Sequence, residues 1–194
     1  MKSILSFKIM TSQNEYNQHY NLIKKIESDD HRIFNDPHEE NIGTILWGVD
    51  NWKSKRIYAK LGVNKSLCSQ TFYSHKNGYK MMLQLYPYGF GFAKGSHISI
   101  SNHILSGPFD ERLEWPFRHS IKLELIDPDT KNPYLSKTLN YKDYPSNEIG
   151  TFPHGEWNVG FSLLTFISHE ELLDNPSLIE DDKILIKVTV QLNP

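Results

Sequence analysis

The sequence is poor in the features that mark secreted, membrane-spanning and zinc-binding proteins. It has one cysteine, Cys68, in 194 residues, so neither an intrachain disulfide nor a cysteine-based zinc cluster can form. No stretch approaches the roughly 18 uninterrupted apolar residues of a membrane-spanning helix. Residues 1–10 lack the small-residue cleavage site of a signal peptide. These absences predict a soluble protein of the cytoplasm.

A charge excess of either sign is also absent. The 21 Lys and Arg residues nearly balance 23 Asp and Glu residues, which gives a net charge of -2. A sequence-wide basic footprint for nucleic acid is therefore excluded. What the chain does have is large side chains, with ten Phe, ten Tyr and four Trp. That content predicts a folded domain with a sizeable core, of about 150 residues, plus a short appendage.

Catalytic and metal-binding motifs are missing as well. The glycine-rich segment from Gly89 to Ser96 has the wrong spacing for a phosphate loop, and a strand rather than a helix is expected after it. The nine histidines show no familiar metal spacing, and no G-x-S-x-G elbow occurs. Adjacent acids such as Asp181 and Asp182 would point to opposite faces of a strand. We therefore expect no enzyme, no metal and no cofactor, and we expect Cys68 to be a small buried side chain in a strand.

Short strand-like segments dominate the chain from residue 43 onward. Many of them alternate apolar and polar residues, which indicates antiparallel strands with one buried face. Asn77-Gly78 between two such segments predicts a hairpin. Turn residues recur between the segments, so the pattern predicts an all-β sandwich or barrel. The expected strands are 44–49, 66–73, 79–86, 97–105, 119–126 and 183–192.

Two helical segments are expected outside the strands. Near the C-terminus, Ser168 followed by Glu171 is a capping-box pattern, and Asn175-Pro176 would end that helix. In the polar first forty residues, apolar side chains fall on one helical stripe, which is a short, imperfect heptad pattern. It predicts either a helix that docks on its own domain or the end of a coiled coil that joins several chains. The domain boundary is expected between residues 1–41 and 42–194, and the stripe consists of Leu22, Ile26 and Ile33.

Six short motifs follow one another in a fixed order. They are residues 44–49, residues 69–74 with 78–81, residues 95–99, residues 107–110, the Leu-Glu-Trp-Pro-Phe segment at 113–117, and Asp181-Asp182 before residues 184–187. In this order they resemble the C-terminal domain of the TRAF proteins, the tumour-necrosis-factor-receptor-associated factors, within the larger MATH family. The likeness runs from about Gly43 to about Val190, and the Trp-Pro-Phe segment points to the TRAF branch.

The resemblance implies a fold and a function. The fold would be an eight-stranded antiparallel β-sandwich with a short N-terminal helix. The function would be that of a non-enzymatic signalling adaptor, which binds short cytoplasmic-tail peptides of TNF-receptor-like receptors and other adaptor proteins by edge-strand addition. A coiled coil in front of the domain would form a homotrimer and provide avidity for trimeric receptors.

The resemblance also places a peptide-binding site on particular residues. Gln84 stands where many family members have an arginine, Phe90 stands at an acidic position, and Ser101 replaces a phenylalanine. Because glutamine cannot make a charge-assisted bond to a carboxylate, we expect a more apolar peptide preference or weak binding. The residues assigned to this site are Gln84, Tyr86, Phe90, Gly91, Ser101, Leu139, Gly150, Thr151, Phe152, Phe161 and Ser162.

Two alternative functions remain open. One is a MATH-type substrate-recognition module for ubiquitin ligation, which would bind Ser/Thr-rich peptides in the same groove. The other is a surface for phosphoinositides and other acidic membrane lipids, formed by a basic cluster beside Trp52. The plainer interpretation of that cluster is a solvated loop or strand edge. Its residues are Lys53, Lys55, Arg56 and Lys60.

Overall fold

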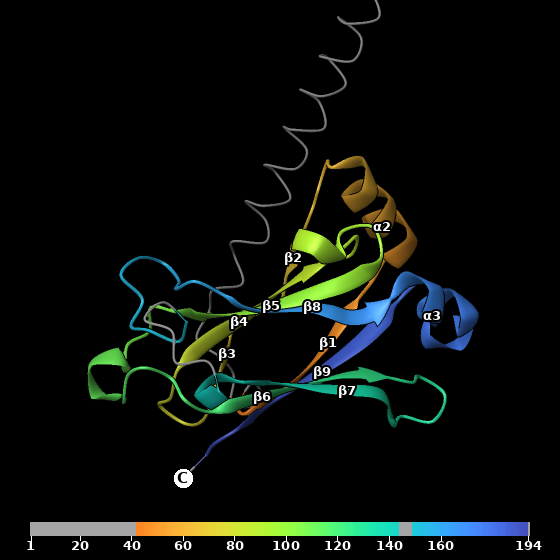
Figure 1. The fold of residues 1–194 in the computed structure, drawn as a ribbon. Helices are drawn as coiled ribbons and strands as arrows, with labels where there is room; N and C mark the ends of the chain where they lie inside the picture. The colour runs from red at the N-terminus through yellow and green to blue at the C-terminus, as the bar shows by residue number, and fades with distance from the viewer. Residues whose placement is uncertain (1–41, 144–148, 194) are drawn as a thin grey trace, which may run out of the picture. The chain divides into compact units, whose positions relative to one another are not determined.

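The structure is a computed structural model, and it describes residues 42–143 and 149–193. These residues form two antiparallel sheets that pack face to face as a β-sandwich (Figure 1). The all-β prediction is thereby confirmed. The expected N-terminal helix, with Leu22, Ile26 and Ile33, lies outside the described residues, so its place and its role stay predictions.

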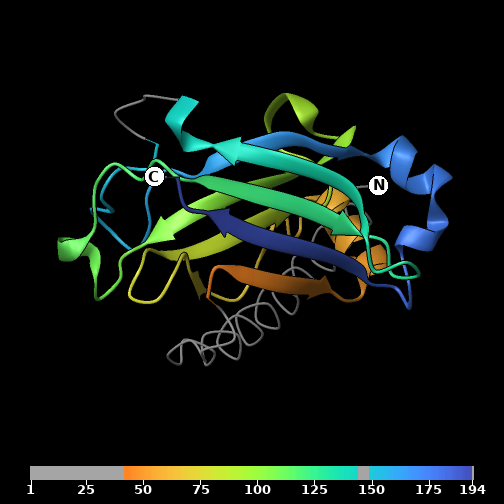
Figure 2. The same ribbon diagram turned by 90° about the horizontal axis from the view of Figure 1, so that it is seen from below.

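One sheet has four strands in the order β1-β9-β6-β7. They are β1 (Thr44–Val49), β6 (Ser120–Ile126), β7 (Pro133–Asn140) and β9 (Ile184–Gln191). Every neighbouring pair is antiparallel, and Figure 2 shows the four strands side by side. The first and last strands of the domain are therefore direct partners.

The second sheet has the order β2-β4-β5-β8, and β3 also pairs with β4. The strands are β2 (Leu67–Cys68), β3 (Phe72–Tyr73), β4 (Lys80–Tyr86), β5 (His97–Leu105) and β8 (Phe161–Ser168). Because β2 and β3 follow one another along the same edge of β4, they act as one interrupted edge strand. Within the described part of the chain this arrangement gives the eight strands that the resemblance implied.

Alternating side chains of the central strands fill the space between the sheets. The strand β9 buries every second side chain and turns the others outward, as the period of two predicts, whereas β4, β5 and β6 also bury residues on their other face. At about 25 cal/mol per Å² of buried apolar surface, this core is the main source of stability. Its fully buried members include Leu83, Leu85, Ile98, Ile100, Ile121, Leu123, Ile186 and Val188.

A cluster of aromatic rings closes one end of the core. The Tyr79 ring packs edge-on against Trp115 and Phe117, with centroids 5.0 and 4.9 Å apart. Tyr141 then joins Phe117 to Phe161, at 4.7 and 4.9 Å. Edge-to-face contacts of this kind stabilise beyond the area they bury. The Trp-Pro-Phe segment thus forms a packed corner of the sandwich.

Two α-helices and four single turns of 3₁₀-helix connect the strands in the described residues. The helix α3 (His169–Asp174) begins as the capping box predicted, because the Ser168 hydroxyl accepts a hydrogen bond from the Glu171 N–H at 3.0 Å. None of the described helices is long and apolar enough to cross a membrane. The 3₁₀ turns are η3 (Gly91–Ala93), η4 (Asp110–Arg112), η5 (Tyr141–Asp143) and η6 (Pro176–Leu178).

The basic cluster lies on the other described α-helix, α2 (Trp52–Leu61), and not on the loop or strand edge that we expected. Trp52 and Ala59 anchor the helix to the sandwich with exposed fractions of 1% and 4%. Its N-terminus is capped by a distant residue, since the Asp182 carbonyl and carboxylate accept the Trp52 and Lys53 N–H groups at 2.8 and 2.9 Å. The side chain at the N-cap position, Asn51, makes no capping hydrogen bond, and the sequence pattern did not lead us to expect this helix.

Cys68 lies in a strand as expected, but the expectation that it is buried was wrong. Cys68 is exposed, because β2 is a two-residue strand at the sheet edge and does not cover both of its faces. A thiol at such an edge is accessible to solvent instead of filling the core.

Candidate functional site

The outer face of the β2-β4-β5-β8 sheet carries a row of polar side chains. Gln84 of β4 lies opposite Ser101 of β5, which in turn lies opposite Ser162 of β8. The Ser101 and Ser162 hydroxyls are 2.6 Å apart. Since neighbours along a strand alternate between faces, this row turns away from the core that Leu83 and Ile100 help to fill. We call the face with Gln84, Tyr86, Ser101, His103 and Ser162 the candidate face.

Hydrogen bonds hold the Gln84 side chain in place. Its Nε2 donates to the Ser66 hydroxyl at 2.9 Å, and its Oε1 accepts from the Tyr86 hydroxyl at 2.8 Å. The His103 Nε2 is 3.1 Å from the same oxygen. The amide is thus engaged at both ends, and its orientation is set by three neighbours.

The candidate face is electrically neutral near pH 7. Burial raises the pKa of Tyr86, which keeps the phenol protonated. Burial lowers the pKa of His103, which keeps the imidazole uncharged despite an opposing hydrogen bond to the Asn158 carbonyl. The neutral ring has one N–H, so it donates either from Nε2 to the Gln84 Oε1 or from Nδ1 to the Asn158 carbonyl, and not to both. None of the side chains in the network is therefore an ion.

An aromatic pair borders this polar network. The Tyr86 and Phe90 rings stack with centroids 4.8 Å apart, and the Phe90 side chain is 48% exposed. Buried Ser99 fixes the loop that carries Phe90, since its hydroxyl accepts from the Phe90 N–H at 3.0 Å and donates to the Leu164 carbonyl at 2.6 Å. A ligand crossing the face would meet an exposed apolar ring next to neutral hydroxyl and amide groups.

The strand β8 forms the edge of the sheet beside this face. Among the described strands it pairs only with β5. An isolated bridge between Ile149 and Val159 precedes β8, and a register shift opposite Ser99 interrupts its pairing further along. There the Lys137 ammonium donates to the Thr165 carbonyl at 2.5 Å. The uninterrupted start of β8, near Ser162, is the part of the edge suited to an added strand.

The comparison with known proteins decides the family. The family model described as "TRAF/meprin, MATH domain" matches residues 64–187. The chain belongs to this family. The resemblance based on the six motifs is confirmed.

The similar proteins share this domain and extend beyond it. The chain is 33% identical over 151 residues to mouse TNF receptor-associated factor 5, with 77% of the chain and 27% of the mouse protein covered. It is 27% identical over 150 residues to human TNF receptor-associated factor 2. The chain thus spans about a quarter of the mouse protein. A solved structure of Notothenia coriiceps TRAF5 has the same fold, with a TM-score of 0.73, 22% identity and coverage of 99% of this chain and 96% of that one.

Six of the residues that the family resemblance assigned to peptide binding lie together. The Gly91 position is beside Leu164, since a Cβ placed there would be 3.7 Å from the Leu164 Cδ1. Gly91 therefore belongs with Phe90 at the border of the face. The six are Gln84, Tyr86, Phe90, Gly91, Ser101 and Ser162.

The other five lie elsewhere. Leu139 and Phe161 point into the core and are 3% and 8% exposed. Gly150 is buried with a positive φ of 75°, and its carbonyl accepts the Phe117 N–H at 2.7 Å. Gly150 thus shapes a corner of the backbone and has no side chain to offer.

Thr151 and Phe152 lie beside the aromatic corner. The Phe152 ring packs against Trp115 with centroids 5.3 Å apart. The Asn158 amide donates to the Thr151 carbonyl at 3.3 Å. The segment that precedes β8, which holds Asn158, thus connects Thr151 to the side of the candidate face.

Sequence reasoning missed four residues that complete the candidate face. Ser66 and Ser99 hold Gln84 and Phe90, as described above. The His103 ring lies 6.1 Å from that of Trp157, which is 52% exposed. The alternation of Ser99, Ser101 and His103 along β5 was a usable signal for three residues on one face.

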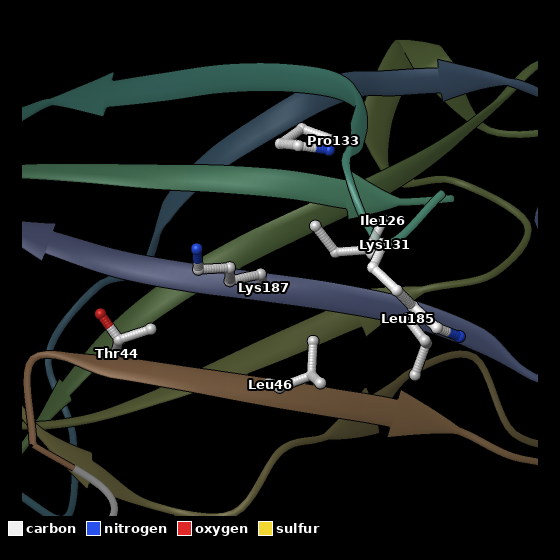
Figure 3. A pocket seen from close by; sticks show the side chains of 7 residues that line it. All are labelled: Thr44, Leu46, Ile126, Lys131, Pro133, Leu185 and Lys187. Atoms are coloured by element: carbon white, nitrogen blue, oxygen red, sulfur yellow. The ribbon is translucent and has the colours of Figure 1, made fainter. Parts of the chain in front are cut away.

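A concavity lies on the outer face of the other sheet, β1-β9-β6-β7. It has a volume of about 280 Å³, and Figure 3 shows its lining side chains coming from β1, β9 and the β6–β7 hairpin. Leu46 and Leu185 give it an apolar wall, and Lys131 and Lys187 border it. In the described part of the chain, no group of three or more His, Cys, Asp or Glu side chains could hold a metal ion. The candidate face is separate from this concavity, since the two lie on different sheets.

Proposed function

We propose that this chain is the peptide-binding module of a signalling adaptor and acts without catalysis. In this proposal a short segment of a receptor tail or adaptor protein adds to the start of β8 and lays its side chains across the candidate face. Membership in the TRAF/meprin MATH family supports the adaptor role. The similar TNF receptor-associated factors carry receptor association in their names.

The observation that carries the proposal is the edge strand beside an exposed aromatic pair. Backbone pairing with an edge provides affinity for an extended peptide, and neighbouring side-chain pockets provide selectivity. Ser162 supplies a half-exposed hydroxyl on the edge strand itself, and the Tyr86–Phe90 pair supplies an apolar platform. A peptide of alternating apolar and small polar residues would match both.

The neutral network predicts the selectivity of the site. A carboxylate in the peptide would find no cation at Gln84, whose amide already bonds to Ser66 and Tyr86. A charged group that loses its hydration without a partner is costly to bury. We therefore expect apolar peptides to bind more tightly than acidic ones.

Titration of the chain with matched peptide panels tests this preference. The panels contain acidic, apolar and Ser/Thr-rich sequences of equal length, followed by calorimetry or fluorescence anisotropy. We expect the apolar panel to bind most tightly, and a clear preference for acidic peptides contradicts the proposed selectivity. A preference for the Ser/Thr-rich panel supports the alternative, a substrate-recognition module for ubiquitin ligation.

The variant Gln84→Arg tests the position of the site directly. A guanidinium at residue 84 adds a charge-assisted bond of about 1.5 kcal/mol, so affinity for acidic peptides rises about tenfold. Gln191→Arg, an exposed residue at the end of β9, is the matched control and leaves binding unchanged. Equal effects of the two changes would place peptide binding away from the candidate face.

We also propose that the chain assembles as a homotrimer through residues before the sandwich. The apolar stripe of Leu22, Ile26 and Ile33 supports this assembly, as does the avidity that several linked sites provide for clustered receptor tails. Sedimentation equilibrium of the full chain measures the assembly state. A trimer that dissociates on Leu22→Asp with Ile26→Asp agrees with the proposal, and a monomeric full chain contradicts it.

A further inference from the structure

The helix α2 presents apolar side chains to solvent. Ile57, Tyr58 and Leu61 are 56%, 48% and 69% exposed, and Val63 in the following loop is 51% exposed. Trp52 and Ala59 fill the contact with the sandwich, so the exposed side chains are on the opposite side of the helix. Figure 1 shows α2 at the periphery of the sandwich, outside both sheets.

The same surface is strongly basic. Lys53, Lys55, Arg56 and Lys60 lie on the helix, and Lys65 follows it. From residue 51 to residue 109 the chain contains no Asp or Glu. This local excess is hidden in the whole-chain net charge of -2.

The acids nearest the start of α2 are engaged by other groups. The Asp50 carboxylate pairs with the Lys183 ammonium at 2.9 Å. The Asp182 carboxylate accepts the backbone N–H of Lys53 at 2.9 Å. Neither carboxylate forms an ion pair with a side chain of the helix in the described contacts, so the positive charge of α2 faces solvent.

Charge and apolar surface are interleaved along one stripe. Ile57, Lys60 and Leu61 follow Lys53 by four, seven and eight residues, which brings the four to one side of a helix. Lysine side chains can extend their apolar stems over such a surface while the ammonium groups reach polar headgroups. A basic amphipathic helix of this kind lies in the plane of a membrane interface.

We propose that α2 docks this domain on an anionic lipid bilayer. Ile57, Tyr58 and Leu61 enter the boundary between headgroups and acyl chains, and the lysines pair with anionic headgroups around them. A bilayer offers both parts of the complementary surface, a negative layer and an apolar layer just beneath it. The proposal concerns a different element from the candidate face and does not depend on peptide binding there.

Co-sedimentation of the full chain with lipid vesicles tests the proposal. The vesicles contain phosphatidylcholine alone, or phosphatidylcholine mixed with phosphatidylserine or phosphatidylinositol bisphosphate. We expect partition into the anionic vesicles only, with a loss as salt increases. Soluble inositol phosphate should not release the bound protein, because a free headgroup lacks the apolar layer.

Two double variants separate the charge from the apolar contribution. Lys53→Gln with Lys60→Gln should lower the partition coefficient about 25-fold, or about fivefold for each lysine. Ile57→Ser with Leu61→Ser should lower it about tenfold at equal charge. Circular dichroism and thermal unfolding identify any variant that has lost its fold.

The controls are Leu46→Ser and Lys142→Glu. Both residues lie on or beside the β1-β9-β6-β7 sheet, away from the exposed side of α2. Leu46 is 57% exposed, close to the value for Ile57, and Lys142 is an exposed lysine of η5. Neither control should change partition. Binding that is equal on neutral vesicles, or insensitive to either double variant, overturns the proposal.

Discussion

Asp182 joins two segments that are far apart in the sequence. Its carboxylate accepts the N–H of Lys53, which lies 129 residues earlier in the chain. The residue at the start of α2, Asn51, makes no side-chain cap of its own. The first N–H groups of a helix need acceptors, and Asp182 supplies two of them through its carbonyl and its carboxylate. The sequence pattern around α2 does not indicate this cap, because its acceptors come from a residue so far away in the chain.

Removing this cap should destabilise the domain. We expect Asp182→Ala to lower the free energy of unfolding by about 1 kcal/mol more than Asp181→Ala. Asp181 is a matched control because both residues have positive φ, 48° and 59°, so both variants share the backbone cost. Urea unfolding measures the difference, and equal losses would mean that the cap contributes nothing.

Gly160 allows the His103 ring to lie over the backbone before β8. A Cβ at residue 160 would be 2.4 Å from the His103 Cε1, which is closer than nonbonded atoms approach. We expect Gly160→Ala to cost about 2 kcal/mol of stability through overpacking. In a double-mutant cycle, His103→Ala should recover part of this loss, and strictly additive effects would contradict the contact.

At the scale of elements, the strands with clean alternation were predicted and two others were not. β7 begins at Pro133, and most of its side chains are exposed or half-buried, so no apolar face stands out. β8 carries a nearly continuous apolar run, and a register shift interrupts its pairing with β5. Edge position and bulging are properties of the pairing between strands, which a single segment does not display.

Ser99 of β5 connects its own strand to β8 and to the loop after β4. Its hydroxyl links the loop after β4 to the bulged part of β8 from a side chain that is 0% exposed. We expect Ser99→Ala to lower the free energy of unfolding by about 2 kcal/mol, because the Phe90 N–H and the Leu164 carbonyl both lose their partner.

Ser101→Ala is the comparison for that variant in equilibrium unfolding. Its partner Ser162 is half-exposed and can bond to water instead, so the loss should be smaller. If Ser101→Ala lowered the free energy of unfolding more than Ser99→Ala does, the hydrogen bonds of Ser99 would not be the stronger set.

At the scale of the whole molecule, three histidines couple stability to pH. Burial lowers the pKa of His103, His119 and His169 below the ordinary value of 6.5. The unfolded chain then takes up more protons than the folded one as the pH falls through that value. The contribution of these three histidines to the free energy of unfolding is therefore fully present above pH 6.5. It is lost as the pH falls through the folded-state pKa values.

We therefore expect the free energy of unfolding to decrease from about pH 7.5 to about pH 5.5. Urea unfolding at a series of pH values measures the slope. His169→Gln should reduce that slope, because burial lowers the pKa of His169 although hydrogen bonds to the Pro87 and Gly95 carbonyls oppose the shift. Stability that stays constant or rises on acidification would contradict the expected direction.

The sequence by itself determined the sandwich, its regular strands, the hairpin at Asn77-Gly78 and the cap of α3, because alternation, turns and capping are local. Only the tertiary structure decided which aromatic residues face solvent. Phe90 remains on the surface beside Tyr86, whereas Phe161 packs against Tyr141 in the core. Of the predicted site residues, Gln84, Ser101 and Ser162 lie in one row because strand register places them there, and register depends on partners far away in the chain. The same division applies to Cys68. Because it is the one cysteine, the sequence alone excludes an intrachain disulfide, whereas its exposure to solvent depends on the position of β2 at the edge of the sheet.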